Sequence, residues 1–362
     1  MSILALNGGS ATIKAASFSM RDGVVQRIAG WNVGREEGVD YLSRELSKAP
    51  ELAAPDIVVH RIVHGADHFA EATELTDDVM ALLRKLEPLA PLHQPFNLDL
   101  VEEARRAWPL AQHIGCFDTA FHQTQSDLQR RYALPRVFHE RGIKHYGFHG
   151  LSYAYVSRAL FAREPALREG RVVIAHLGSG ASACAVQCGV SVATSMGFSP
   201  LDGLVMGTRC GQLDPGVLLH LLREGMDVQA LEKLLYKESG LLGVSGISPD
   251  LQVLLSSDDL QAEQAITLFV RRCCEVIAAL AASMQGIDAL VFTGGIGEHQ
   301  AETRAYIMQR LGWLGAYMDE ARNTEHSWCI SAANSRVRVF VVPTDEEQEM
   351  VRQAFEERRV SP

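Results

Sequence analysis

Two segments about half a chain apart repeat one pattern of apolar and polar residues. Residues 3–18 read ILALNGGSATIKAASF and residues 172–186 read VVIAHLGSGASACAV. In each, an apolar run leads to one polar residue, Asn7 or His176, then to a turn with glycine and serine and a second strand-like run. Short apolar runs of this kind are typical of buried strands. The pattern predicts two similar β-hairpins, which arise either from a duplicated domain or by chance.

A third apolar run, residues 289–293, is followed by the turn GGIGE. Strand, glycine turn and helix in this order form phosphate sites in many α/β proteins, because the turn exposes backbone N–H groups. Helical periodicity predicts helices over residues 39–48, 77–86, 97–107, 152–162, 216–224, 228–238, 262–284, 302–311 and 346–358. Strands that alternate with helices predict an α/β fold.

Length and charge narrow the picture. A chain of 362 residues favours two domains, since single cores rarely grow beyond about 250–300 residues. The net charge is −10 and no basic run is present, so we expect no nucleic-acid partner. We also expect no signal peptide and no membrane span, because no apolar run approaches the ~20 residues that a span needs. Seven cysteines without a C-x-x-C pair fit a reduced, cytoplasmic protein.

Two common nucleotide-binding motifs are absent from the sequence. The chain has no G-x-x-x-x-G-K-[ST] and no full G-x-G-x-x-G after an N-terminal strand, which disfavours P-loop and dinucleotide-binding folds. Gly178, Ser179 and Gly180 form only a fragment of the second motif.

Arg61 lies among apolar residues in the segment IVVHRIVHG. A buried arginine needs a partner, which is either a structural carboxylate or an anionic ligand. His60, His64 and His68 have the spacing of metal ligands on a helix, but this segment reads as a strand and a turn, which disfavours a metal site.

Further polar residues stand in or beside turns. Asp118 ends an apolar run in GCFDTAFH and is either a helix N-cap or a site residue. His149 in YGFHG is either a surface residue or an exposed imidazole in a site, and Arg209 lies in the loop MGTRCG. Two arginines and a histidine suit phosphoryl transfer, because guanidinium groups bind phosphate oxygens in pairs and stay protonated. The acids of PTDEE, residues 343–347, are either helix caps or ligands of Mg²⁺.

Taken in order, these segments resemble the acetate kinase family of short-chain acid kinases, over essentially the whole chain. The most specific stretches are HRIVHG, APLHQP, FDTAFHQT, YGFHGLSYAYV, SMGFSPLDGLVMGTRCGQLDPG, GVSGISPD and FTGGIGE. The resemblance implies a duplicated ribonuclease-H-like α/β fold, as in actin and the sugar kinases, with two lobes around a cleft. The N-terminal lobe would comprise residues 1–118 and 345–362, and the C-terminal lobe residues 119–344.

The resemblance also implies roles for individual residues. The catalytic residues would be Arg61, Asp118, His149 and Arg209, and Asn7 and Glu346 would hold Mg²⁺, or Mn²⁺ in its place. The acid would contact Arg61, Val63, Leu92, Phe148 and Pro200. The nucleotide, ATP or ADP, would contact Ser10, Thr12, Lys14, His176, Leu177, Gly178, Ser179, Gly180, Asp250, Leu251, Gln252, Gly295, Ile296, Gly297, Glu298 and His299.

The implied activity is a reversible, Mg²⁺-dependent, in-line transfer of a phosphoryl group between ATP and acetate, giving acetyl phosphate and ADP. A carboxylate is already a nucleophile at neutral pH, so alignment and charge stabilisation are the main tasks. Alternatives are a propionate kinase, a kinase with another phosphoryl donor, and a nucleotide-binding sensor without catalysis. Family analogy further implies a homodimer.

The chain departs from the family pattern at several positions near the nucleotide. Ser179 replaces an asparagine, and Gln252 replaces an arginine that would lie beside the purine. Asp202, Gln212 and Asp345 replace a glutamate, an aspartate and an asparagine. No catalytic position is lost, but Ser179 and Gln252 predict loose selection of the base.

Overall fold

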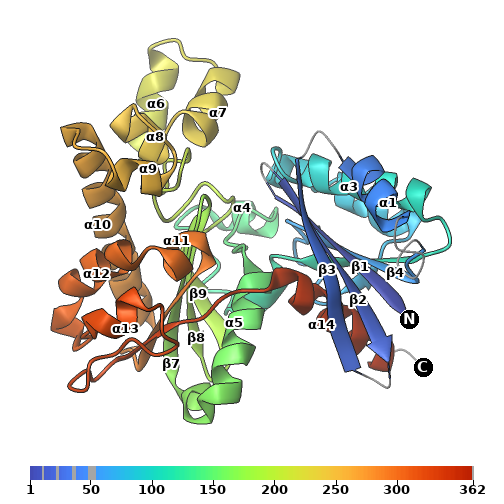
Figure 1. Ribbon diagram of the computed structural model, residues 1–362. Helices are drawn as coiled ribbons and strands as arrows, with labels where there is room; N and C mark the ends of the chain where they lie inside the picture. The colour runs from blue at the N-terminus through green and yellow to red at the C-terminus, as the bar shows by residue number, and fades with distance from the viewer. Residues whose placement is uncertain (10–11, 22–23, 35–37, 48–53, 361–362) are drawn as a thin grey trace. The chain divides into compact units, whose positions relative to one another are not determined.

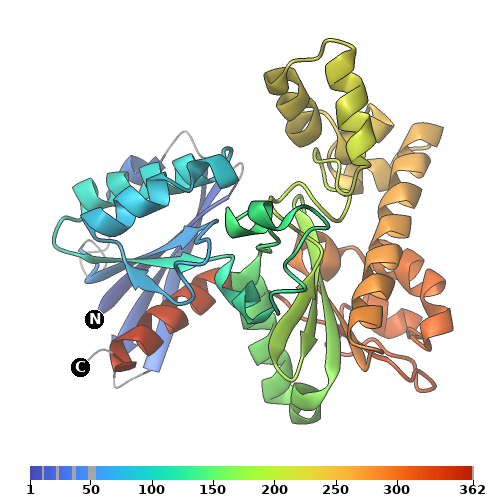
Figure 2. The same ribbon diagram turned by 180° about the vertical axis from the view of Figure 1, so that it is seen from behind.

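The computed structural model describes residues 1–9, 12–21, 24–34, 38–47 and 54–360. Contacts within the chain define two compact units, each with one β-sheet (Figures 1 and 2). Unit 1 comprises Met1–Gln123, Phe148–Tyr155 and Asp345–Pro362, and unit 2 comprises Thr124–Gly147 and Val156–Thr344. The lobe boundaries expected from the sequence, after residues 118 and 344, stay a prediction.

The sheet of unit 1 has six strands in the order β3-β2-β1-β4-β6-β5. A meander of antiparallel strands, β1 to β3, forms one side, and β4 and β6 continue it parallel to β1. The strands are β1 (Ser2–Gly8), β2 (Thr12–Arg21), β3 (Val24–Gly34), β4 (Ile57–Ile62), β5 (Thr73–Glu74) and β6 (Gln112–Phe117).

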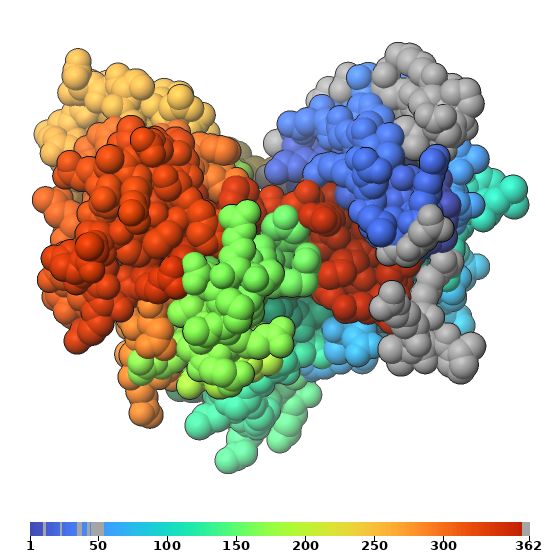
Figure 3. Space-filling model, turned by 60° about the horizontal axis from the view of Figure 1, so that its bottom comes forward, coloured from blue at the N-terminus to red at the C-terminus, as the bar shows by residue number. Residues whose placement is uncertain are grey.

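Helices cover both faces of this sheet, because successive side chains of a strand point to opposite faces. Leu4 and Leu6 pack toward α1 (Gly38–Ser47) and α3 (Gln94–Ala107), whereas Ile3 and Ala5 pack toward α14 (Glu346–Val360). Helix α14 carries Met350, Val351 and Ala354 into this second core. In Figure 3 the red C-terminal segment lies against the blue N-terminal strands. The end of the chain thereby returns to its beginning.

The sheet of unit 2 has five strands in the order β11-β10-β7-β8-β9. The strands are β7 (Arg171–Leu177), β8 (Ala181–Gln187), β9 (Val190–Thr194), β10 (Ala289–Thr293) and β11 (Arg338–Val341). The long helix α10 (Leu260–Ser283) packs on β7, β8 and β9. Strands β7 and β10 are buried almost throughout, as expected for parallel strands covered on both faces.

The two sheets share one topology. In each, an antiparallel meander of three strands is followed by two strands parallel to the first, so that β1, β2, β3, β4 and β6 correspond to β7, β8, β9, β10 and β11. The hairpins predicted over residues 3–18 and 172–186 are β1–β2 and β7–β8. The predicted duplicated α/β fold is confirmed, and the two similar sequence segments form corresponding hairpins of the two sheets.

The remaining helices are α2 (Asp77–Arg84), α4 (Arg136–Glu140), α5 (Gly150–Arg163), α6 (Pro215–Arg223), α7 (Val228–Lys237), α8 (Gly240–Ser245), α9 (Leu251–Leu255), α11 (Gly294–His299), α12 (Ala301–Arg310) and α13 (Glu320–Thr324). Of these, α2, α5, α6, α7 and α12 lie where the periodicity predicts helices, whereas the short helices α4, α8, α9, α11 and α13 were not predicted. Two differences matter for the site. Helix α3 begins at Gln94, three residues earlier than predicted, since Pro95 is tolerated in a first helical turn. The GGIGE segment, expected as a turn, forms the short helix α11.

In the described part of the chain, no helix combines the length and the apolar character that crossing a bilayer requires.

Candidate active site

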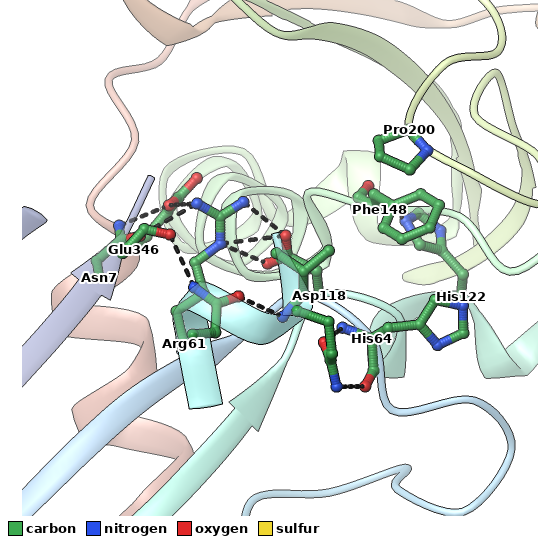
Figure 4. Close-up of polar contacts among 12 residues, drawn as sticks. Asn7, Arg61, His64, Asp118, His122, Phe148, Pro200 and Glu346 are labelled. Atoms are coloured by element: carbon green, nitrogen blue, oxygen red, sulfur yellow. Dashed lines mark hydrogen bonds and ion pairs between the residues drawn. The ribbon is translucent and has the colours of Figure 1, made fainter. Parts of the chain in front are cut away.

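Arg61 lies near the carboxyl end of β4, beside the parallel strand β6. Asp118 directly follows β6, so strand pairing brings its carboxylate to the guanidinium. Arg61 Nε lies 3.1 Å from both Asp118 oxygens, and Nη2 lies 2.6 Å from Oδ2 (Figure 4). This bidentate, charge-assisted contact is among the stronger hydrogen-bonded pairs that proteins form. The Asp118 carboxylate therefore orients Arg61.

Asn7 and Glu346, the first residue of α14, lie on the other side of Arg61, and Glu347 joins them through Asn7. Asn7 Oδ1 accepts a hydrogen bond from Arg61 Nη1 at 3.1 Å. Asn7 Nδ2 donates to Glu346 at 2.8 Å and to Glu347 at 2.7 Å. Glu346 Oε2 lies 4.0 Å from Arg61 Nη1. The position at which α14 begins thus brings two carboxylates to the end of β1.

Three carboxylates, Asp118, Glu346 and Glu347, surround the single guanidinium of Arg61, and Arg27 lies 3.6 Å from Glu347 at the edge of the cluster. Burial opposes the charge of Arg61, but Asp118, Glu346 and Glu347 outweigh it and raise the pKa of Arg61. Burial raises the pKa of Asp118, while Arg61 and the backbone N–H of His149 oppose that rise. Burial also raises the pKa of Glu347, against the hydrogen bond from Asn7. A further cation beside these carboxylates would stabilise their charged forms.

The donor set of the cluster fits Mg²⁺. Among the described residues no group of three His, Cys, Asp or Glu side chains forms a complete metal cage. Mg²⁺ seldom needs one, because it usually binds one or two carboxylates, keeps several waters and takes phosphate oxygens as further ligands. Asn7, Glu346 and Glu347 supply oxygen atoms and excess negative charge, and no nitrogen or sulfur ligand competes among them.

His149 has a strained backbone at the same place. Its φ is +60°, in the left-handed region that costs a non-glycine residue about 1–3 kcal/mol. Its N–H faces Asp118, and the N–H of Gly150 donates to the Asp118 carbonyl at 2.9 Å. A Cβ at Gly150 would lie 2.1 Å from that carbonyl oxygen, so only glycine fits there. Asp118 and His149 are therefore fixed to each other through the backbone.

The first hairpin carries the predicted phosphate contacts of unit 1. Lys14 pairs with Asn7 across the β1–β2 ladder and is exposed, so both side chains lie on one face. Lys14 acts on the charge of Glu347. Thr12 is half-buried at the start of β2, and Ser10 lies outside the described residues.

Of the apolar residues predicted to contact the acid, Val63, Leu92 and Phe148 belong to unit 1. Val63 and Phe148 are buried, and Leu92 is half-buried just before α3. The ring of His64 contacts the edge of Phe148, with centroids 5.6 Å apart. His122 binds the Phe148 carbonyl at 3.0 Å. Pro200, the fifth predicted residue, belongs to unit 2 and is buried there.

In unit 2, the glycine turn after β7 lies against the glycine-rich start of helix α11, which follows β10. A Cβ at Gly294 would lie 2.8 Å from the Leu177 carbonyl oxygen and 3.2 Å from His176 Nε2. Gly294 has a φ of +78°, which also requires glycine. The remaining turn residues Gly178, Ser179 and Gly180 are half-buried or exposed, as is Gly295. The turn after β7 and the start of α11, both with few side chains, thus form one surface that could receive phosphate groups.

The Arg209 loop is held by backbone contacts to the same turn. The N–H of Gly207 donates to the Ser179 carbonyl at 3.1 Å. Gly240, at φ +66°, lets α8 approach so closely that a Cβ would lie 2.2 Å from the Met206 carbonyl oxygen. Arg209 Nη1 donates to the Pro200 carbonyl at 3.0 Å. A second arginine is thereby fixed beside the phosphate-type turns of unit 2.

The residues predicted to hold the nucleoside surround the starts of α9 and α11. Asp250 caps α9 by accepting from the N–H of Gln252 at 2.9 Å; both side chains are exposed, and Leu251 is buried. Glu298 Oε1 accepts from the N–H groups of Gly294 and Thr344. That carboxylate therefore ties α11 to the segment after β11. Ile296 is half-buried, Gly297 is buried, and the side chain of His299 is 74% exposed.

The sequence of this chain is similar to those of known proteins over most of its length. Residues 17–352 match the acetokinase family. The acetate kinase of Methylocella silvestris is 46% identical over 340 residues, covering 91% of this chain and 84% of its own. That of Nitrobacter hamburgensis is 41% identical, covering 96% of this chain and 93% of its own. The chain belongs to the acetokinase family.

Solved structures agree with this family assignment. The acetate kinase of Porphyromonas gingivalis is 34% identical, with a TM-score of 0.85 over 98% of this chain and 99% of that one. A propionate kinase from Francisella tularensis is 32% identical, with a TM-score of 0.89 over 97% and 98%. The prediction from the sequence, a phosphotransferase of the acetate kinase family with a carboxyl group as acceptor, is confirmed.

Glu347, one of the acids of PTDEE, shares Asn7 with Glu346 at this acetokinase-family site. Two further polar residues there were not predicted: Gln94, which binds the backbone of His64, and Asn97, which binds the backbone of Val63 and Gly8. A signal for the last two was present, since a helix beginning at Gln94 places residues 94 and 97 on one face. The helix predicted over residues 97–107 left out Gln94 and so concealed this signal.

Proposed function

We propose that this chain catalyses reversible, Mg²⁺-dependent transfer of a phosphoryl group between ATP and acetate, giving ADP and acetyl phosphate. The single observation that carries the proposal is the oriented Arg61. Asp118 and Asn7 fix its guanidinium, which keeps N–H donors on both Nη atoms for an anionic ligand. Membership of the acetokinase family supports the choice of ligands.

Arg61 and Arg209 would bind the carboxylate and the phosphoryl group in flight. In-line transfer spreads negative charge over the equatorial oxygens, and fixed guanidinium groups stabilise that charge without reorganising. His149 would donate a hydrogen bond to the same group, and its strained backbone fixes its position beside Asp118. The acetate carboxylate needs no base, because it is ionised at neutral pH. Val63, Leu92, Phe148 and Pro200 would contact its methyl group.

Asn7 and Glu346 would hold Mg²⁺, with Glu347 close enough to contribute charge. The ion would neutralise phosphate oxygens as charge develops during transfer. Lys14, Thr12 and Ser10 of the first hairpin would contact nucleotide phosphates, as would the second turn from His176 to Gly180. Asp250–Gln252 and Gly295–His299 would flank the nucleoside. We further propose a homodimer in the cytoplasm, by analogy with the family.

A second acid is favoured by one observation, the similarity to the propionate kinase of Francisella tularensis. A pocket of half-buried and buried apolar residues discriminates one methylene by only about 1–3 kcal/mol. We therefore propose that propionate is also turned over, and that acetate and propionate are favoured over longer acids.

Initial rates of hydroxamate formation test the proposed function. Purified protein is assayed with MgATP and acetate, propionate, butyrate or octanoate. The proposal predicts saturable turnover of acetate, measurable turnover of propionate, and a steep fall in kcat/KM at octanoate. Octanoate turned over as well as acetate would refute the proposed acyl pocket, and no turnover of any acid would refute the proposed reaction.

A further inference from the structure

Helix α3 directs two amide side chains away from its own backbone and into neighbouring segments. Gln94 and Asn97, in its first turn, are 0% and 2% exposed. Neither caps the helix, whose N-cap residue is His93 without a side-chain cap bond. Buried amides that do not serve their own helix must satisfy polar groups elsewhere, and their targets show what they position.

Asn97 joins two segments that are far apart in the sequence. Its Oδ1 accepts from the N–H of Val63 at 3.2 Å, and its Nδ2 donates to the Gly8 carbonyl at 3.1 Å. Val63 follows Arg61 by two residues and lines the proposed acyl pocket. Gly8 ends β1, one residue after Asn7, at the start of the first hairpin turn.

The approach of Asn97 to Gly8 is close enough to exclude a side chain there. A Cβ at Gly8 would lie 2.9 Å from Asn97 Nδ2 and 3.0 Å from the ring of Phe96. The hairpin continues from this point with the Gly9 N–H donating to the Thr12 carbonyl at 2.8 Å. The position of α3 therefore fixes where the hairpin leaves the sheet.

Gln94 makes a similar contact, but to one segment only. Its Oε1 accepts from the N–H of His64 at 3.0 Å, and its Nε2 donates to the carbonyl of the same residue at 3.0 Å. The ladder between β4 and β6 ends at Ile62, so no strand supplies these partners. Both bonds therefore fix the backbone of His64, which follows Val63 of the proposed acyl pocket.

We infer that Gln94 and Asn97 are positioning residues for the proposed reaction, with different reach. Asn97 fixes the position of Val63, in the proposed acyl pocket, relative to Gly8, at the start of the β1–β2 hairpin turn that would contact the nucleotide. Gln94 fixes only the backbone of His64, next to Val63. As neutral amides they add no charge to the cluster around Arg61. The inference rests on the proposed function, because it concerns the binding of the acid and the nucleotide.

Two nearly isosteric apolar substitutions, Asn97→Leu and Gln94→Met, test the difference in reach. We expect Asn97→Leu to raise KM for both ATP and acetate by about tenfold, since a displaced backbone loses contacts to both substrates. Gln94→Met should raise KM for acetate alone by a similar factor. In both variants kcat should change less than KM, because Arg61 keeps Asp118 and Asn7.

Gln123→Met is the matched control. Gln123 Nε2 donates to the carbonyls of Ala66 and Phe69, so this variant also removes amide bonds to a loop after β4, farther along the chain. It should lower thermal stability without a selective change in either KM. If Asn97→Leu behaves like this control, or if Gln94→Met raises KM for ATP as much as Asn97→Leu does, the inference is wrong.

Two further measurements keep the test decisive. If Asn97→Leu does not fold, Asn97→Ser, which keeps a hydroxyl donor and acceptor, should show the same pattern to a smaller degree. Titration with MgADP separates this inference from the proposed function. Even if the unsubstituted protein turned over no acid, weaker MgADP binding in the Asn97 variant than in Gln94→Met would support the inference, and equal binding would overturn it.

Discussion

At the scale of single residues, Arg61 is the cation that contacts the carboxylates of Asp118 and Glu346 in unit 1. A buried guanidinium is tolerated because Asp118 binds it in bidentate fashion and Asn7 accepts from its Nη1. Arginine suits this position better than lysine, since its planar fork matches both the carboxylate and a phosphoryl group and does not lose its proton.

The first prediction concerns the two arginines. Arg61→Ala and Arg209→Ala should each lower kcat by about 10²–10³, the effect of removing one electrostatic donor to a transition state, or roughly 3–4 kcal/mol. Arg84→Ala, which removes a surface arginine bound to Glu87, Asp99 and Glu102, is the control and should leave kcat unchanged. Steady-state kinetics with circular dichroism checks both points. Near-normal kcat in the two site variants would remove the arginines from the reaction.

The second prediction concerns the metal. Glu346→Gln keeps the shape of the side chain but removes its charge, so the Mg²⁺ concentration for half-maximal activity should rise by about tenfold. Glu356→Gln, on the same helix but exposed and paired with Arg352, should leave it unchanged. The measurement is a Mg²⁺ titration at saturating ATP and acetate. An unaltered titration for Glu346→Gln would show that the ion binds elsewhere.

At the scale of elements, strand β4 and its neighbours bury three histidines in the neutral form. His60 Nε2 lies 3.0 Å from His113 Nδ1, with Arg105 nearby, and burial together with these neighbours lowers the pKa of His60 well below its usual range. Burial likewise lowers the pKa of His113. Burial lowers the pKa of His64 to about 4, against the opposing charge of Asp67.

The third prediction is that unit 1 loses stability in mild acid. Below pH 6.5 the unfolded chain binds protons at His60, His64 and His113 that the folded chain does not, so the free energy of unfolding falls as pH falls. His64, with a folded pKa of about 4, should contribute about 1.4 kcal/mol of loss between pH 7.5 and 5.5, and the lowered pKa values of His60 and His113 add to the loss in the same direction. Urea titrations at the two pH values measure it. His64→Asn should reduce the loss, whereas His220→Gln, at an exposed site, should not; equal losses in all proteins would contradict the explanation.

The fourth prediction concerns the nucleotide and belongs to the start of α9. Gln252 is exposed there and cannot stack on a base as a cationic arginine can. Ser179 likewise offers one hydroxyl in place of an amide. We therefore expect GTP and ITP to support turnover within about tenfold of ATP, a difference of ~1.4 kcal/mol. Values of kcat/KM for the three nucleotides and pyrophosphate test this. Gln252→Arg should restore selectivity; a strict preference for ATP in the unsubstituted protein would show that other residues bind the base.

Elements were predictable from the sequence where one local pattern determines them. The hairpins β1–β2 and β7–β8 and the long helix α10 follow from apolar periodicity. The predicted start of α3, residue 97, was wrong. Pro95 is compatible both with a helix that begins after it and with a place in the first helical turn, and the packing of α3 on β4 decides for the second. The roles of the Gln94 and Asn97 side chains could not be predicted either, because their backbone partners lie in segments far away in the sequence.

At the scale of the whole molecule, duplication explains why chemistry recurs at equivalent places. Strands β1 and β7 each lead into the glycine turn of a hairpin. Asn7 and His176 are the second-last residues of these two strands. Arg61 in β4 corresponds topologically to the end of β10, where the second glycine-rich segment of unit 2 begins. The family was predictable because its motifs occur in order. The ion pair with Asp118 was not, because sequence alone left Arg61 with either a carboxylate or a ligand.

The most direct test of the account measures ADP release and acetyl phosphate formation together, with MgATP, in the presence and absence of acetate. A kinase transfers the phosphoryl group only to its acceptor, so we predict one acetyl phosphate per ADP with acetate, and almost no ADP without it. ADP release that is independent of acetate would identify a nucleotide hydrolase. Nucleotide binding with neither product would identify a sensor, and either result would contradict the proposed phosphoryl transfer to a carboxylate.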